Sequence, residues 1–183
     1  MQYIKGLENY NDEHFTAITI GKFDGLHLGH EMLIEKVREY QEKDGVKSIV
    51  LTFDVSCVSA QKNMMSSEER RKLLENRVDY LVECTLDEQI SHMEAKDFIK
   101  EVLVDKFHIK YIVVGEDFRF GYQKKGDCRL LAELGECFGY QVDVVQDVCH
   151  DNRKISSTYI RELLEKEEYA LAEKLLGHSI KKL

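Results

Sequence analysis

GKFDGLHLGH, residues 21–30, is the segment that decides the predicted fold, because it connects an apolar, β-like run at residues 15–20 to an amphipathic helical pattern. A strand, a glycine-rich turn and a helix start predict a phosphate site, since the first turn of a helix has unpaired N–H groups and the positive dipole end. His27 and His30 share one face if the helix has begun there, and Gly29 lets a ligand approach the backbone. The segment therefore predicts a cradle for a triphosphate.

Length and composition fit one domain, residues 1–183, with a full-sized core. The chain has 26 basic and 34 acidic side chains and a net charge of −8, so nucleic acid is not an expected partner. Its five cysteines are odd in number and form no CxxC pair, which indicates free thiols in a reducing cytosol. The amino terminus lacks an apolar signal core and no apolar run could span a bilayer, so we expect a cytoplasmic protein without membrane contact.

Apolar runs and helical patterns alternate along the chain. We expect strands at residues 15–20, 48–53, 80–84, 111–114 and 140–145, and helices at residues 32–45, 66–77, 94–107, 128–138, 156–161 and 167–176. The alternation predicts a doubly wound, Rossmann-like parallel α/β sheet of about five strands with right-handed crossovers.

Three loops rich in glycine or polar residues follow predicted strands, so they can meet at the carboxyl edge of the sheet. They contain GKFDGLHLGH, GEDFRFGYQKKGD (residues 115–127) and ISSTYIR (residues 155–161). Ser157, Thr158 and Arg161 in the last loop are donors suited to phosphate oxygens, and none of these residues is an evident nucleophile.

Several enzyme classes are disfavoured by missing motifs. The chain has no GxSxG, no GxxxxGK[ST] and no GxGxxG after the first strand, which argues against a serine hydrolase, a P-loop enzyme and a dinucleotide oxidoreductase. Phosphoryl or nucleotidyl transfer by positioning and charge stabilisation remains.

The motifs GKFDGLHLGH, VGEDFRFG and ISSTYIR together resemble the FMN adenylyltransferase module of bacterial bifunctional riboflavin kinase/FMN adenylyltransferases, or FAD synthetases. The resemblance covers nearly the whole chain. It implies a nucleotidyltransferase of the HxGH type that uses ATP with Mg²⁺, takes FMN as substrate and releases FAD and pyrophosphate without a covalent enzyme intermediate.

The same resemblance implies roles for individual residues. His27, His30 and Arg161 are the implied catalytic residues, and Ser157, Thr158 and Arg161 would hold the β and γ phosphates. The implied nucleotide site is Gly21, Phe23, Gly25, His27, His30, Gly115, Ser157, Thr158 and Arg161, and the implied flavin site is Asp24, Asp54, Asp117 and Phe118. No metal-binding residue is assigned.

Plainer interpretations stand beside some of these roles. An aspartate in a tight turn, such as Asp24, more often caps local backbone than binds metal. Phe118 and Phe120 alternate beside a loop and more often anchor it into the core. Lys124 and Lys125 are most simply a solvated pair, although they could also act as counter-charges near a triphosphate.

The chain departs from the family pattern in two places. TFDVSC, residues 52–57, replaces the TFxPHP of the family, so the Pro-His-Pro on the flavin side is missing and weaker FMN binding is expected. The sequence stops after LLGHSIKKL, residues 175–183, where a riboflavin kinase module would follow, so we expect no FMN synthesis from riboflavin.

Three functions remain open from the sequence. The first is adenylyl transfer to FMN, the second is adenylyl or cytidylyl transfer to another phosphorylated small acceptor, and the third is a non-catalytic flavin- or nucleotide-binding module. Intact HxGH and SSTxIR motifs favour the catalytic alternatives.

Overall fold

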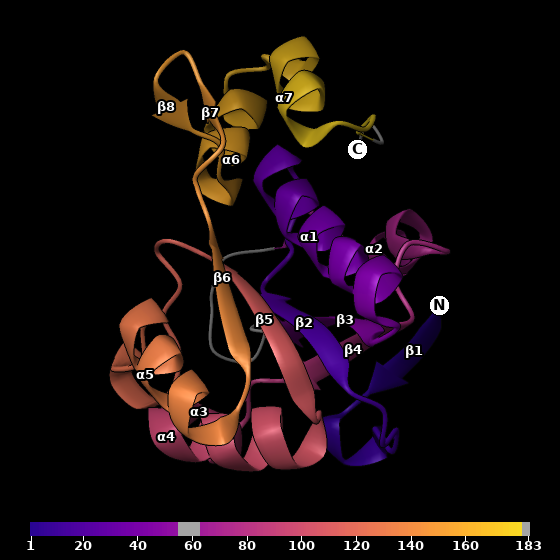
Figure 1. Cartoon of the computed structure of the whole chain (residues 1–183). Coiled ribbons are helices and arrows are strands. Elements are labelled where there is room, and N and C mark those ends of the chain that lie inside the picture. Colours follow the sequence, from indigo (N-terminus) through magenta and orange to yellow (C-terminus); the bar gives the residue numbers. More distant parts are fainter. Residues whose placement is uncertain (55–62, 181–183) are drawn as a thin grey trace.

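A parallel sheet lies at the centre of the computed structural model, which describes residues 1–54 and 63–180 (Figure 1). The strand order is β1-β4-β3-β2-β5-β6, and each neighbouring pair is parallel. The strands are β1 Gln2–Lys5, β2 Thr16–Gly21, β3 Lys47–Asp54, β4 Tyr80–Thr85, β5 Ile109–Gly115 and β6 Gln141–Val145, and a separate antiparallel pair is formed by β7 Cys149–His150 and β8 Arg153–Lys154.

The predicted doubly wound parallel sheet is confirmed, and each of the five expected strands is present within two residues of its expected ends. The expected sheet of about five strands has one more than the five placed in the sequence, because β1 adds a sixth strand at one edge. Only Ile4 of β1 is buried, so this edge strand leaves no apolar run in the sequence. The β7–β8 hairpin was also missed, since its strands are two residues long.

The six expected helices are present with two corrections, and three short helical elements, η1, α3 and η3, were not expected. They are η1 Leu7–Asn9, α1 Leu28–Asp44, α2 Ser67–Leu74, α3 Glu88–Ser91, α4 Ala95–Asp97, η2 Phe98–Lys106, η3 Tyr122–Lys124, α5 Cys128–Phe138, α6 Ser157–Glu165 and α7 Tyr169–Leu176. The helix expected at residues 94–107 is a short α-turn followed by the π-helix η2. Helix α1 begins at Leu28, before its first regularly spaced apolar residues, with His27 at the N-cap.

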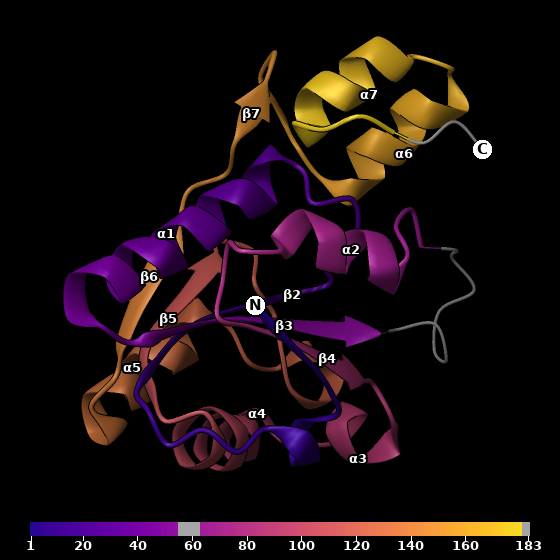
Figure 2. The ribbon, with the colours of Figure 1, turned by 90° about the vertical axis from the view of Figure 1, so that its right-hand side faces the viewer.

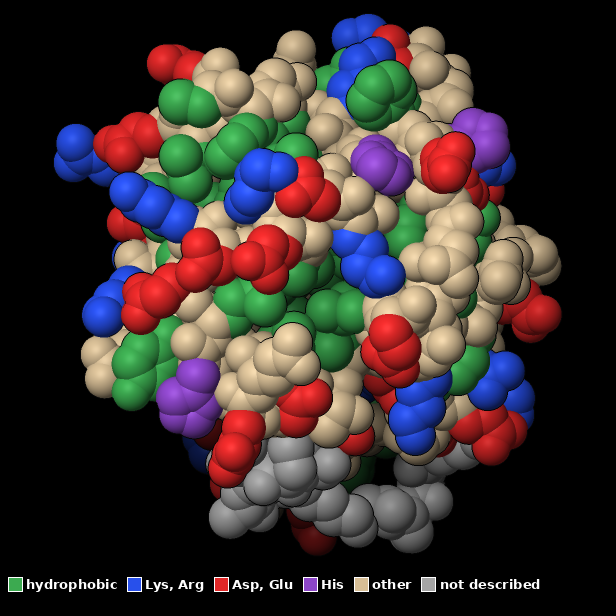
Figure 3. Space-filling model, turned by 90° about the horizontal axis from the view of Figure 1, so that it is seen from below, with side chains coloured by type: hydrophobic (Ala, Val, Ile, Leu, Met, Phe, Trp, Pro, Cys, Tyr) green, Lys and Arg blue, Asp and Glu red, His purple; other side chains and the backbone are tan. Residues whose placement is uncertain are grey.

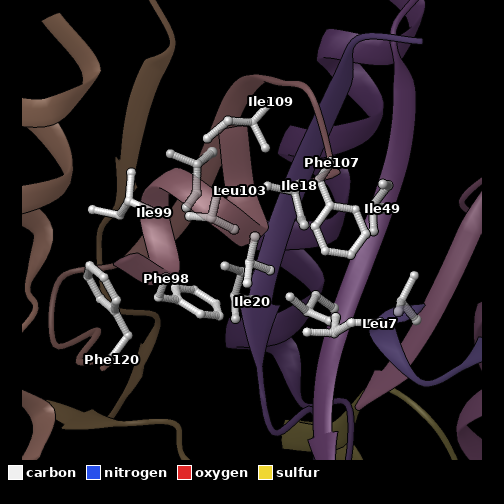
Figure 4. Packing of buried hydrophobic residues seen from close by; sticks show 14 of the residues in the cluster. Leu7, Ile18, Ile20, Ile49, Phe98, Ile99, Leu103, Phe107, Ile109 and Phe120 are labelled. Atoms are coloured by element: carbon white, nitrogen blue, oxygen red, sulfur yellow. The ribbon is translucent and has the colours of Figure 1, made fainter. Parts of the chain in front are cut away.

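Helices cover both faces of the sheet. Figure 2 shows α1 and α2 on one side of the strands and α3, α4 and α5 on the other. Because successive strand residues face opposite sides, Ile18 and Ile20 of β2 point to the side of η2, where they join a cluster that includes Phe98 (Figure 4). Ala17 belongs to a cluster on the other face with Val37 of α1.

The strand order contains a topological switch point between β2 and β5. From β2 the sheet extends through β3 and β4 to β1 on one side, and through β5 to β6 on the other. Open α/β sheets bind ligands at such a point, in the crevice beyond the carboxyl ends of the strands. Gly21 and Gly115 are the last residues of β2 and β5, so the first two motif loops begin side by side.

Helices α6 and α7 pack against each other beyond this edge of the sheet (Figure 1). Their cluster includes Ile160 and Leu163 of α6 and Leu175 of α7, and Leu28 of α1 packs against it. The pair places ISSTYIR over the carboxyl edge, so all three motifs meet there.

The surface in Figure 3 carries acidic side chains mixed with basic ones. Over residues 1–54 and 63–180, no helix combines the length and the hydropathy that crossing a bilayer requires. Residues 55–57, where the sequence departs from Pro-His-Pro, lie outside the described residues.

Candidate active site

A cleft of about 780 Å³ opens at the carboxyl ends of β2 and β5 and collects most of the residues that the sequence singled out. Its lining includes Gly21, Asp24, His27, His30, Gly115, Asp117, Phe118, Ser157, Thr158 and Arg161. Three predicted site residues lie behind the lining. Phe23 and Gly25 are buried in the turn, and Asp54, the last residue of β3, follows the lining residue Phe53 without lining the cleft itself.

His27 and His30 form a stacked pair at the start of α1. Their ring centroids are 3.7 Å apart and the ring planes differ by 17°, which confirms that the two imidazoles share one face. A Cβ on Gly29 would lie 3.2 Å from Cε1 and Nδ1 of the His27 ring. Glycine at position 29 therefore avoids a close contact with the His27 ring, which lies above the start of α1.

Burial keeps both imidazoles neutral at pH 7. Burial, and then the positive charge of Lys154, lower the pKa of His27 to about 4. Burial, His27 and Arg70 hold the pKa of His30 well below its ordinary value. A neutral imidazole retains one N–H donor, so each ring can still donate a hydrogen bond to a phosphate oxygen.

The buried Nδ1 atoms indicate where that proton resides. Nδ1 of His27 and Nδ1 of His30 are buried and have no hydrogen-bond partner in the described part of the chain. An unpaired buried N–H is less common in proteins than an unpaired acceptor, so the favoured tautomer leaves Nδ1 unprotonated. The donor of each ring is then Nε2.

Asp24 connects three parts of the chain. One carboxylate oxygen accepts hydrogen bonds from the amides of Met64 and Met65 at 2.8 and 3.2 Å, and the other pairs with Arg161. Asp24 thus accepts hydrogen bonds from backbone amides, but these amides lie 40 and 41 positions away, so the expected cap of local backbone is replaced by a long-range one.

The third motif reaches the first through its hydroxyl groups. Ser156 caps α6 by accepting from the amide of Tyr159 at 3.2 Å. The Ser157 hydroxyl donates to the carbonyl of Asp24 at 2.9 Å, so it holds the turn before α1. Thr158 lines the cleft and its side chain is exposed there.

The second motif supplies both packing and cleft wall. The rings of Phe118 and Phe120 stack with centroids 5.4 Å apart, and Phe120 is 8% exposed within the main core. Anchoring of the loop by these aromatics is therefore confirmed. Both rings also line the cleft, so they form its wall as well as the anchor.

Lys154 is a cleft residue that none of the sequence motifs contains. Its Nζ lies 2.6 Å from a carboxylate oxygen of Asp117 and 2.7 Å from one of Asp147. Burial opposes its charge, but the hydrogen bonds to these two carboxylates outweigh that effect and raise the pKa of Lys154. Its position directly before the ISST sequence is the feature by which it could have been identified as a site residue.

An apolar half of the cleft was also missed. It is formed by Phe53, Leu86, Ile90, Phe98, Phe118 and Phe120. Four of these residues lie outside the three motifs, and their apolar side chains look like ordinary core residues in the sequence.

A doubly wound sheet with an HxGH helix start and an SSTxIR helix start at its switch point is the architecture of a nucleotidyltransferase. The profile of the FAD synthetase family matches residues 9–159, and the chain belongs to that family.

Curated relatives agree with this assignment. Bifunctional riboflavin kinase/FMN adenylyltransferases from Buchnera aphidicola (Schizaphis graminum) and Escherichia coli K12 are each 33% identical to the chain over 97% of its length. The protein of the same name from Haemophilus influenzae is 34% identical. The chain spans about 60% of the length of each of these relatives.

A solved structure shares the fold. The crystal structure titled as a macrolide-efflux protein from Streptococcus pneumoniae superposes with a TM-score of 0.84 and is 26% identical. The match covers 97% of this chain and 70% of that one.

Proposed function

We propose that the chain transfers AMP from ATP to FMN, with FAD and pyrophosphate as products. The observation that carries the proposal is the division of one cleft into a polar half around the histidine pair and an apolar half under Phe118. FMN needs both, since it has a flat apolar ring system and a phosphate. Family membership supports the same reaction.

The polar half fits a triphosphate. His27 and His30 offer neutral N–H donors, Thr158 offers a hydroxyl, and Lys154 and Arg161 offer positive charge. Hydrogen bonds from charged donors to phosphate are among the stronger ones in proteins, and arginine can bind two oxygens at once. The first turn of α1 adds backbone N–H groups and the positive dipole end.

The apolar half fits the isoalloxazine ring of FMN. Phe53, Ile90 and Phe98 lie there with Phe118, and aromatic rings favour offset stacking or edge contacts with flat partners. Asp117 lies on the same loop as Phe118 and is exposed at the cleft, where its carboxylate can accept from the polar edge of a ring.

The chemistry requires no enzyme nucleophile or general base. A phosphate oxygen of FMN attacks the α-phosphorus of ATP, a new P–O bond forms, and the bond from the α-phosphorus to the bridging oxygen breaks. The electron pair leaves with pyrophosphate. A phosphate monoester is largely dianionic at pH 7 because its second pKa is about 6, so no proton must be removed first. Donors on His27 and His30 stabilise the charge that develops on the transferred group.

Mg²⁺ belongs to the proposal as the cation that accompanies ATP and neutralises phosphate charge. Within residues 1–54 and 63–180 there is no group of three His, Cys, Asp or Glu side chains that could hold a metal ion. The proposed cation is therefore bound mainly by phosphate oxygens and water, as Mg²⁺ commonly is in nucleotide sites.

A cytoplasmic location is part of the same proposal. It rests on the five cysteines of the sequence, whose odd number and lack of a CxxC pair do not indicate the disulfide framework of a secreted domain.

Incubation of the purified chain with MgATP and FMN tests the proposal, with FAD and pyrophosphate measured by chromatography and a coupled assay. Stoichiometric formation of both is expected. If another phosphate ester is adenylylated and no FAD forms, the acceptor is that ester and not FMN. If MgCTP is preferred to MgATP, the nucleotide donor is CTP. Tight binding of both ligands without turnover would instead support a binding module.

A further inference from the structure

The turn at residues 22–25 is held from outside at every carbonyl. The carbonyl of Lys22 accepts from Thr52 Oγ1 of β3 at 2.9 Å, and that of Phe23 accepts from Arg70 Nε of α2 at 3.2 Å. The carbonyls of residues 24 and 25 accept from Ser157 Oγ of α6 at 2.9 Å and from His178 Nε2 after α7 at 2.8 Å. Four consecutive carbonyls are thus bonded to side chains of four different segments.

The turn needs this support because its backbone is strained. Phe23 and Leu26 both have φ of 45°, in the left-handed region that residues other than glycine rarely adopt. Such conformations persist only where the surrounding structure fixes them, and they are concentrated at functional sites. Here the strained turn leads directly into His27.

Arg70 is the charged member of this support. It is 5% exposed, and its Nη1 donates to a carboxylate oxygen of Glu83 at 2.9 Å. Glu83 is 6% exposed and also accepts from the hydroxyls of Ser67 and Tyr3. One side of the guanidinium is therefore held by Glu83 of β4, while its Nε donates to the carbonyl of Phe23.

A buried ion pair is weak evidence for stability alone, because well-packed apolar replacements are often as stable. Arg70 and Thr52 do not line the cleft, so neither is placed to contact a ligand there. Their shared property is the hydrogen bond to the turn.

We propose that Arg70 is a positioning residue that sets the geometry of the histidine pair through the carbonyl of Phe23. The phenyl ring of Phe23 is fully buried, and its centroid lies 4.9 Å from that of the His30 ring. Fixing the backbone of Phe23 fixes this ring, which is tilted by 43° against the His30 ring and packs beside it.

Arg70 also acts on His30 through its charge. The charged or titratable groups that act on His30 are His27 at the start of α1 and Arg70 of α2, while Lys154 of β8 acts on His27. Loss of the guanidinium therefore raises the pKa of His30 toward its ordinary value, whereas a lysine at position 70 retains the charge.

The two effects separate in a set of variants. Arg70→Met should lower kcat for FAD formation by about 10- to 100-fold with KM for MgATP changed less than about threefold, as expected for misplaced catalytic groups. In the same variant, the ring signals of His30 in an NMR titration should move to a higher midpoint. Arg70→Lys should also lower kcat, because an ammonium group lacks the fork that spans Phe23 and Glu83, but it should leave the His30 midpoint near that of the parent.

Arg77→Met is the matched control. Arg77 is half-buried where Arg70 is fully buried, and it likewise pairs with glutamates, Glu31 and Glu35 of α1, but its side chain does not bond to the turn. It should retain the kcat and the His30 midpoint of the parent.

Thr52→Val keeps the test decisive if Arg70→Met does not fold. This nearly isosteric change removes only the donor to Lys22, so it should lower kcat and leave the His30 midpoint in place. Parental kcat in both Arg70→Lys and Thr52→Val would overturn the proposal, as would equal losses in Arg77→Met.

The turnover readout rests on the proposed function, whereas the NMR readout does not. If the parent chain forms no FAD, the proposed function fails on its own. The positioning role is then decided by the contacts between the two imidazole rings, measured by nuclear Overhauser effects. These should weaken in Arg70→Lys and Thr52→Val but not in Arg77→Met, and unchanged contacts in all three variants would overturn the role.

Discussion

The carboxylate of Asp24 and the guanidinium of Arg161 form an ion pair that joins the turn before α1 to helix α6, 137 residues further along the chain. Their side chains are 7% and 18% exposed, so the pair is largely removed from water. The first and third motifs are therefore coupled to each other as well as to any ligand between them.

Removal of the arginine should cost more stability than removal of both charges. Arg161→Met leaves the buried Asp24 carboxylate, among the described residues, with the two amides as its donors, at a cost of about 3 kcal/mol. Asp24→Asn in the same chain retains an oxygen for those amides and removes the charge, so the double variant should recover part of the loss. Urea unfolding of the two single variants and the double variant measures the coupling, and strictly additive effects would contradict it.

The histidine pair should affect turnover much more than binding. His27→Ala or His30→Ala removes an N–H donor that acts on developing charge, and such a donor is typically worth about 10² to 10³ in rate. The Kd for FMN, measured by calorimetry, should change little. His14→Ala is a suitable control because His14 is an exposed residue outside the cleft. Parental turnover in either alanine variant of the pair would refute the assignment.

The buried histidines should also make the fold sensitive to acid. The folded-state pKa of His27 is about 4, below the ordinary value of 6.5, so between these values the unfolded chain binds a proton that the folded chain does not. Stability is therefore fully present above about pH 6.5 and falls as the pH decreases toward 4. From this lowering of the pKa, the loss from His27 is on the order of 3 kcal/mol.

Urea unfolding at pH 7 and pH 4.5 checks this prediction. His27→Phe retains an aromatic ring beside His30 and removes the titrating group, so its stability should fall less than that of the parent between the two pH values. An equal pH dependence of parent and variant would show that His27 does not contribute.

Local signals explain why the sequence predicted so much of the site. A phosphate cradle needs a strand end, a glycine-rich turn and a helix start in direct succession, and residues 21–30 contain all three. Likewise, the buried central strands β2, β3 and β5 appear as short apolar runs because both of their faces are covered.

Contacts between residues that are far apart in the chain gave no comparable signal in the sequence. Asp24 binds Arg161 and the amides of residues 64–65, partners that no sequence spacing identifies. Phe98 looked like a residue on the core face of a regular helix, yet it begins a π-helix and lines the cleft. Residues of this kind acquire their roles from the crossing of segments at the switch point, which only the folded chain reveals.

The departure from Pro-His-Pro at residues 55–57 gives a prediction about the acceptor. This segment follows Asp54 at the end of β3, and both Phe53 before it and Asn63 after it line the cleft. Proline restricts φ, so a segment with two prolines has less conformational entropy to lose when FMN binds, by roughly 1 kcal/mol for each residue fixed. The replacement Val55→Pro, Ser56→His, Cys57→Pro should therefore tighten FMN about tenfold and leave MgATP affinity unchanged, as measured by calorimetry.

Ser56→His alone is the control for that replacement, because it adds the imidazole without the restricted backbone. If the restriction is the cause, the single variant should bind FMN like the parent while the triple variant binds it more tightly. Equal FMN affinity in the triple variant and the parent would contradict the explanation from conformational entropy. The parent could instead adenylylate another phosphate ester and leave FMN unchanged at every concentration. The part of the cleft next to Phe53 would then select the acceptor, and the three substitutions should shift the preference of the enzyme toward FMN.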